Sequence, residues 1–138
     1  MKREKGFTLI ELLAVIIILS VIMVIAVPKV LDVINKSKEE AFIDSAYGIS
    51  DSAKYYYFEN NMTSNYNFEF ENGKLKNNEE LKYKGTSPDS GNLVINSDGK
   101  IKLAFYSDSL NLCVKKEFND KKIKKVTGVT KISVIQIW

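Results

Sequence analysis

The fold is decided by residues 6–27, which read GFTLIELLAVIIILSVIMVIAV. From Leu12 to Val27, the only side chain that is not apolar is Ser20. Counted from Phe7, the stretch holds 21 residues. As an α-helix it would be roughly 31 Å long, at about 1.5 Å per residue. That length matches the hydrocarbon core of a bilayer, which is about 30 Å thick. The sequence therefore predicts one membrane-spanning helix near the N-terminus.

The residues around this stretch allow more than one interpretation. Lys2, Arg3 and Lys5 precede it, so the positive-inside rule predicts a cytoplasmic N-terminus and an external chain after Pro28. A secretory signal peptide is one interpretation, but the apolar run is long for a signal peptide, and Ala26 is the only small residue near its end. A plain single-pass anchor is a second interpretation.

Neither of these interpretations explains Glu11. A carboxylate within a membrane span costs about 2.5–3.5 kcal/mol on insertion scales when it lies near the centre of the bilayer. Near the membrane surface the cost is smaller, but a plain anchor still has no use for the charge. An ionisable residue in such a segment indicates a functional site and calls for a partner.

The segment from Gly6 to Leu12, Gly-Phe-Thr-Leu-Ile-Glu-Leu, resembles the processing site of type IV prepilins and of the related pseudopilins. The resemblance implies that residues 1–6 are a leader peptide. A prepilin peptidase would cut between Gly6 and Phe7 and N-methylate the new terminus at Phe7. Of the 138 residues, 132 would remain after removal of the six leader residues.

The resemblance also assigns roles to Glu11 and Pro28. Glu11 would pair with the terminal amine of a neighbouring subunit during filament assembly. Such a pair rewards the correct register, because each charge is costly when it is desolvated alone. Pro28 stands 21 residues after Phe7, where pilins commonly carry a proline that kinks or locally melts the helix.

After Pro28 the pattern becomes amphipathic. Apolar or small residues recur at three- and four-residue steps, with charged residues between them, which is typical of a helix packed against a core. The members of this stripe are Leu31, Ile34, Ala41, Phe42, Ser45, Ile49, Ala53 and Tyr56. We therefore predict one helix that continues to about Phe58, with residues 7–27 in the membrane or filament core and residues 28–59 as its amphipathic half.

Residues 60–138 are predicted to form a small globular head. Residues 60–90 are polar and are expected to form a variable surface loop, in which Phe68–Glu71 alternates like a short strand. Residues 91–138 are expected to form the sheet, with a hairpin of Leu93–Ile95 and Ile101–Phe105 around a Gly-containing turn. Further strands are predicted at Leu110–Phe118 and Lys131–Trp138. The predicted fold class is α+β, with the long helix packed on an antiparallel sheet of three or four strands.

The composition argues against an enzyme. The chain has no histidine, and its one cysteine, Cys113, lies in an apolar strand pattern where a core role is expected. No cofactor is predicted. Asp89 and Asp98 are interpreted as turn residues rather than calcium ligands, because calcium needs six to eight convergent oxygens. No metal site is predicted.

The charges are unevenly distributed along the chain. Residues 39–98 have a net charge of −6 and residues 113–138 a net charge of +5. These segments are either solvated surface or complementary faces of neighbouring subunits. The lysine run in residues 115–125 also leaves nucleic-acid binding open, although a basic patch alone is only an electrostatic footprint.

The sequence as a whole predicts a structural subunit of a type IV pilus or pilus-like filament. A pseudopilin or minor pilin of a secretion or DNA-uptake system is the alternative within the family, and a monomeric membrane-anchored binding protein is the alternative outside it. The expected partners are other pilin subunits, the prepilin peptidase, a membrane assembly platform and, before assembly, the cytoplasmic membrane. The filament itself would be extracellular, with adhesion, twitching motility, secretion or DNA uptake as possible roles.

Overall fold

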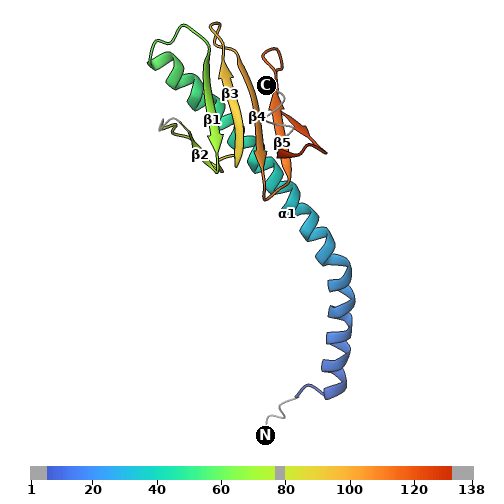
Figure 1. Ribbon diagram of the computed structural model, residues 1–138. Coiled ribbons are helices and arrows are strands. Elements are labelled where there is room, and N and C mark those ends of the chain that lie inside the picture. Colours follow the sequence, from blue (N-terminus) through green and yellow to red (C-terminus); the bar gives the residue numbers. More distant parts are fainter. Residues whose placement is uncertain (1–5, 77–79, 132–138) are drawn as a thin grey trace. The chain divides into compact units, whose positions relative to one another are not determined.

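The computed structural model describes residues 6–76 and 80–131, and its first element is the single long helix α1, Leu9–Glu59 (Figure 1). The helix has 51 residues and continues through Pro28. The prediction of one helix that ends near Phe58 is therefore confirmed. The chain divides between Ser37 and Lys38 into two compact units, and the head belongs to the second.

An antiparallel sheet follows the helix, in the order β2-β1-β3-β4-β5-β6. The strands are β1 (Tyr66–Glu71), β2 (Lys74–Leu75), β3 (Ser90–Ile95), β4 (Ile101–Ser107), β5 (Leu112–Lys116) and β6 (Lys124–Val126). The α+β class is confirmed, but the prediction of three or four strands is wrong, because the described residues contain six. The alternating segment Phe68–Glu71 belongs to β1, which lies between β2 and β3, so the sheet already begins within the stretch 60–90 that was predicted as a loop. Strands β2 and β6 have only two and three residues and therefore show no alternation in the sequence. The strand predicted over Lys131–Trp138 lies, apart from Lys131, outside the described residues.

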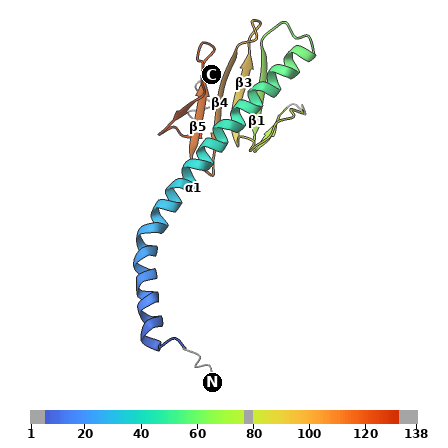
Figure 2. The same ribbon diagram turned by 180° about the vertical axis from the view of Figure 1, so that it is seen from behind.

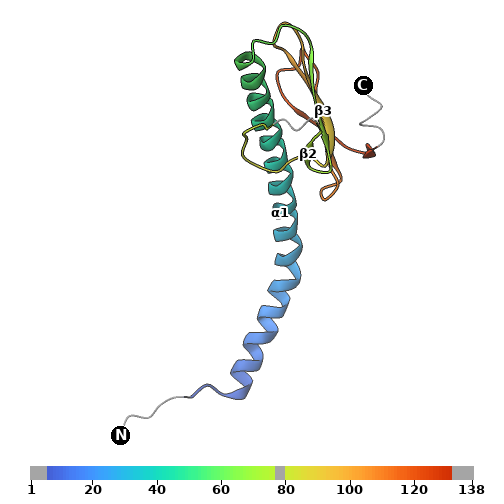
Figure 3. The same cartoon turned by 60° about the vertical axis from the view of Figure 1, so that its left-hand side comes forward.

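From Lys38 onward, α1 lies across one face of the sheet, and helix and sheet form two layers (Figures 2 and 3). The core between these layers consists of the apolar side of the helix and the inward residues of β1, β3, β4 and β5. The helix contributes Phe42, Ala46, Ile49, Ala53 and Tyr57, and the strands contribute Phe68, Phe70, Leu93, Ile95, Ile101, Leu103, Phe105, Leu112 and Val114. Of the predicted stripe, Phe42, Ser45, Ile49 and Ala53 are buried, which confirms the amphipathic pattern in the head. The prediction is wrong for Leu31, Ile34 and Ala41, which are exposed. Leu31 and Ile34 precede the compact unit of the head, which begins at Lys38. Ala46 and Tyr57 complete the buried side, and Tyr56 is only half-buried.

The opposite face of the sheet carries a second, smaller apolar cluster. Ala104, Tyr106 and Cys113 are buried there, with Val126 and Val129 packed against them. Cys113 is only 2% exposed, which confirms its predicted core role. Burial raises the pKa of its thiol, and the nearby Lys115 only partly offsets that effect.

The hairpin between β3 and β4 is also as predicted. The N–H of Gly99 donates to the Asn96 carbonyl oxygen over 2.8 Å, and the Lys100 N–H donates to the Asn96 side chain, also over 2.8 Å. Gly99 has φ +74°, a conformation that side chains disfavour. A Cβ at this position would stand 2.8 Å from the outermost atom of the Phe58 ring. Because Phe58 is exposed and can move aside, the positive φ is the main reason why the turn favours glycine.

Candidate functional site

Gly6 and Phe7 immediately precede the first turn of α1. Both are exposed, and the side chain of Phe7 is 87% exposed. Apart from its neighbours in the chain, no described residue has an atom within 4 Å of the place where a Cβ on Gly6 would stand. The peptide bond between the two residues is therefore sterically open to a peptidase.

Thr8 and Glu11 form a reciprocal cap on the N-terminus of α1. The Thr8 N–H donates to Glu11 Oε2 over 2.9 Å, and the Glu11 N–H donates to Thr8 Oγ1 over 3.3 Å. This capping box satisfies two backbone donors that a helix terminus leaves without an internal partner. A carboxylate in the first turn is also stabilised by the positive end of the helix dipole.

A role was predicted from the sequence for Glu11 but not for Thr8. The missed signal is a threonine followed three residues later by a glutamate, directly before an apolar run. It places Thr8 at the N-cap and Glu11 at the third helical position, and the observed start of α1 at Leu9 agrees with it.

The helix beyond Glu11 presents an apolar surface on every side. Residues 9–27 are all exposed, Glu11 is their only ionisable residue, and the most apolar window of α1 has a mean hydropathy of 3.1. By length and composition α1 could cross a membrane. A helix that is hydrophobic all round requires an apolar environment, either lipid or other helices.

Pro28 follows this surface and lies inside α1. Because proline has no N–H, the carbonyl of Val24 cannot form its usual hydrogen bond within the helix. The distance along the axis from Glu11 to Pro28 is about 25 Å, at about 1.5 Å per residue. Glu11 and Pro28 therefore lie near opposite ends of the apolar run.

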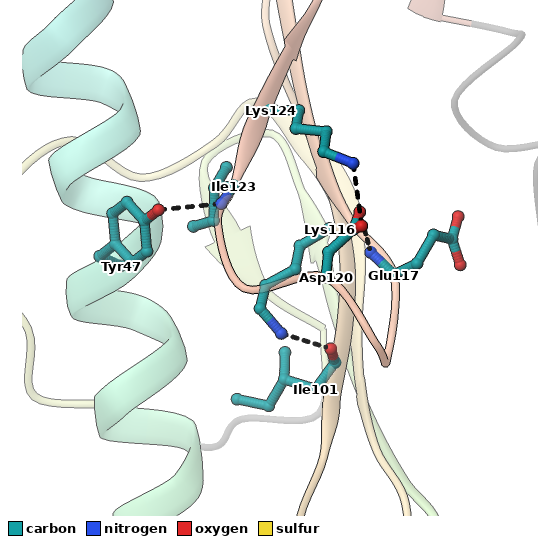
Figure 4. Close-up of polar contacts among 7 residues, drawn as sticks. All are labelled: Tyr47, Ile101, Lys116, Glu117, Asp120, Ile123 and Lys124. Carbon is teal, nitrogen blue, oxygen red and sulfur yellow. Dashed lines mark hydrogen bonds and ion pairs between the residues drawn. The ribbon is translucent and has the colours of Figure 1, made fainter.

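In the head, a short segment before β6 is held firmly in place (Figure 4). Asp120 accepts hydrogen bonds from Lys124 Nζ over 2.9 Å and from the Glu117 N–H over 3.3 Å. These two bonds hold the pKa of Asp120 below its usual value. The Ile123 N–H donates to the Tyr47 hydroxyl over 2.9 Å, which ties the segment to α1.

Lys116, at the end of β5, lies beside this segment. Its Nζ donates to the Ile101 carbonyl oxygen over 3.1 Å. Burial and then the nearby charge of Lys54 lower the pKa of Lys116, and Asp120 opposes them. Lys116 therefore makes a contact within the head, so not every lysine of residues 115–125 is available to bind a ligand.

The two aspartates considered for calcium do not form one ligand set. Asp89 precedes β3 and Asp98 follows it, so the strand separates them. Asp89 Oδ2 accepts the Asp108 N–H over 2.7 Å. Among residues 6–76 and 80–131, no group of three or more histidine, cysteine, aspartate or glutamate residues could hold a metal ion.

The four consecutive aromatic residues at the end of α1, residues 55–58, divide between core and surface. Tyr57 is buried and donates from its hydroxyl to the Ser64 carbonyl oxygen over 3.0 Å. Tyr56 packs edge-on against Phe68. Tyr55 and Phe58 are 69% and 60% exposed.

Fold and site together define a protein with one apolar, capped N-terminal helix and an α+β head. Within that class, residues 1–27 match the family described as "Prokaryotic N-terminal methylation motif", the prepilin signature of type IV pilins and pseudopilins. Proteins with this motif are structural subunits, processed by prepilin peptidase and assembled with other pilins. No curated protein and no solved structure matches the chain.

Proposed function

We propose that this chain is a prepilin that is cleaved between Gly6 and Phe7, methylated at Phe7 and polymerised into a type IV pilus or pilus-like filament. The observation that carries the proposal is Glu11, the one ionisable residue within the apolar run of a segment that matches the methylation motif. An anchor gains nothing from this charge, whereas an assembling subunit uses it to set the register between neighbours.

The geometry of the cap supports this role for Glu11. Cleavage before Phe7 keeps Thr8 and its N–H, so the capping box persists in the mature chain. The cap occupies Oε2 of Glu11, while a carboxylate has two oxygens that can each accept hydrogen bonds. Glu11 can therefore cap its own helix through Oε2 and accept the amine of a neighbouring Phe7 through Oε1.

The new amine also needs an external partner for a physical reason. After cleavage, Phe7 would carry a positive charge at the N-terminus of α1, where the helix dipole is itself positive. Because both Phe7 and the following apolar run enter a water-poor environment, an unpaired ammonium there would be costly. The carboxylate of a neighbouring subunit relieves that cost.

Different segments of the chain then have different roles. Residues 7–27 form the membrane span of the precursor and the core of the filament, Pro28 allows the helix to bend between its two halves, and residues 28–59 carry the head. The precursor lies in the cytoplasmic membrane with its leader inside, and the assembled filament is extracellular. The exposed residues within 60–90, outside the buried positions of β1, contribute to the surface of the filament.

The test compares the native host with a strain that lacks prepilin peptidase. The proposal predicts that sheared surface filaments contain the protein only when the peptidase is present, while the peptidase-less strain retains the precursor in its membrane. Membrane-bound, unassembled protein of the same size in both strains would overturn the proposal and would favour a monomeric anchor.

A further inference from the structure

The exposed side of α1 in the head carries a row of acidic residues. Glu40, Asp44 and Asp51, here called the acidic stripe, are all exposed. At 3.6 residues per turn they lie on one side of the helix and extend over about 16 Å. Among residues 6–76 and 80–131, none of the three forms an ion pair. Like charges four residues apart, such as Glu40 and Asp44, destabilise an isolated helix.

A compact basic surface lies on the segment before β6. Lys121 and Lys122, here called the basic loop, are both exposed. In the part of the chain that the structure describes, neither of them forms an ion pair, whereas Lys124 pairs with Asp120 and Lys125 pairs with Glu39.

Hydrogen bonds anchor the backbone on both sides of the basic loop. Asp120, directly before it, is bound by the Glu117 N–H and by Lys124 Nζ. Ile123, directly after it, is buried, and its N–H donates to Tyr47. A surface that is already ordered loses little conformational entropy when it binds.

We propose that the basic loop of one subunit docks on the acidic stripe of a second copy of this chain in the filament. This inference rests on the proposed function, because it places the contact between assembled subunits. Within its own head the basic loop lies beside α1, because Ile123 binds Tyr47, yet neither of its lysines pairs with the acidic stripe in the described residues. In the helical filament of the proposed function, the loop of one subunit would meet the stripe of the next, which is a heterologous contact. A heterologous contact that does not close into a ring continues as a helical filament. A second copy accounts for both patches, whereas nucleic acid would account only for the basic loop.

The test uses full-length chains in the native assembly system and two variants with reversed charge. One is Lys121→Glu/Lys122→Glu and the other is Glu40→Lys/Asp44→Lys. Each variant alone places like charges at every contact, and its yield in sheared filaments is expected to fall at least about tenfold. When both variants are expressed together, opposite charges face each other again at mixed contacts. Co-expression is therefore expected to restore filaments that contain both variants.

The matched control is Lys82→Glu/Lys84→Glu, which makes the same change of charge at two other exposed lysines of the head. It is expected to assemble like the wild type. Complementation in trans also excludes a folding defect, because a head that cannot fold is not repaired by a second defective chain.

The possible outcomes separate this inference from the proposed function. Defective single variants with restored assembly on co-expression support the contact. Normal assembly of the Lys121→Glu/Lys122→Glu variant overturns it, including a result in which that variant only loses retention of duplex DNA. Defects that co-expression does not restore also overturn it, because the charges then act within one head. Absence of wild-type filaments would instead refute the proposed function.

Discussion

Replacing Glu11 by glutamine separates the two roles that the structure gives to this residue. Glutamine at the third helical position still accepts the Thr8 N–H, so the capping box is retained. The substitution removes only the charge. An ammonium and a carboxylate about 4 Å apart attract by about 4 kcal/mol at an effective dielectric constant of about 20. That loss corresponds to roughly a 10³-fold lower association constant between neighbouring subunits, at about 1.4 kcal/mol per factor of ten.

The assay measures the fraction of mature protein in sheared filaments relative to the membrane, together with the extent of leader cleavage. Glu11→Gln is expected to be cleaved normally and to be almost absent from filaments. Glu11→Ala should behave similarly in assembly and should in addition lose the cap. Thr8→Ala keeps the charge and removes the hydroxyl that accepts the Glu11 N–H, at a cost of about 1 kcal/mol. It is therefore expected to assemble with only a modest reduction.

Two patterns of results would refute this reasoning. If Glu11→Gln assembled at the wild-type level while Glu11→Ala did not, filament formation would depend on the helix cap and not on the charge. If both variants assembled normally, Glu11 would have no part in assembly.

Three further predictions concern the head. Cys113 is buried, so its thiol is expected to react with a soluble alkylating reagent on the order of 10³-fold more slowly than in denaturant, because reaction requires an opening that costs several kcal/mol; fast native labelling, measured by mass, would contradict its placement. Gly99→Ala is expected to lower the free energy of unfolding by about 1–2 kcal/mol because of its positive φ, and additional replacement of Phe58 by alanine should relieve only the steric part; a neutral Gly99→Ala in chemical denaturation would show that the turn differs. The pKa of Asp120 is lowered chiefly by the hydrogen bond from Lys124. Asp120 therefore contributes its full stabilisation above the unfolded-state pKa of about 3.9, and this stabilisation is lost as the pH falls through the lower pKa of the folded state. Asp120→Asn should reduce the slope of the unfolding free energy against pH on the acid side, and an unchanged slope would argue against the contact.

The helix and the hairpin could be predicted because their signals are local. The apolar run after Glu11 is continuous, and the part of the predicted stripe from Phe42 to Ala53 has helical periodicity within a few turns. The turn at Gly99 has a composition that favours positive φ between two apolar strands. In each case the residues that specify the element are also the residues that form it.

The position of β1 could not be predicted in the same way. Its Tyr66 pairs with Ile95 of β3, 29 positions further along the chain, and the intervening segment is polar. Strand β6 reads Lys-Lys-Val and has no apolar alternation. Its place depends on tertiary contacts, namely the buried side chain of Ile123 and the hydrogen bond to Tyr47. Such contacts override local strand propensity.

The candidate site shows the same division. Gly6, Phe7 and Glu11 could be identified as a motif, and the capping box of Thr8 and Glu11 was also present in the sequence as a recognisable spacing. That spacing implies the hydrogen-bond partners of Glu11, but they were not predicted, because a carboxylate in an apolar run first suggests a partner on another chain. In the structure, the backbone N–H of Thr8 in the same chain is a partner of Glu11.

The most direct test of the central claim is the intact mass of the protein isolated from its native host, combined with the sequence of its N-terminal peptide. We expect a mature chain that begins with Phe7 and is heavier than the unmodified chain by one methyl group on its terminal amine. A chain that begins at Met1 would contradict leader cleavage, and one that begins near Val27 would show that the apolar segment is a conventional signal peptide.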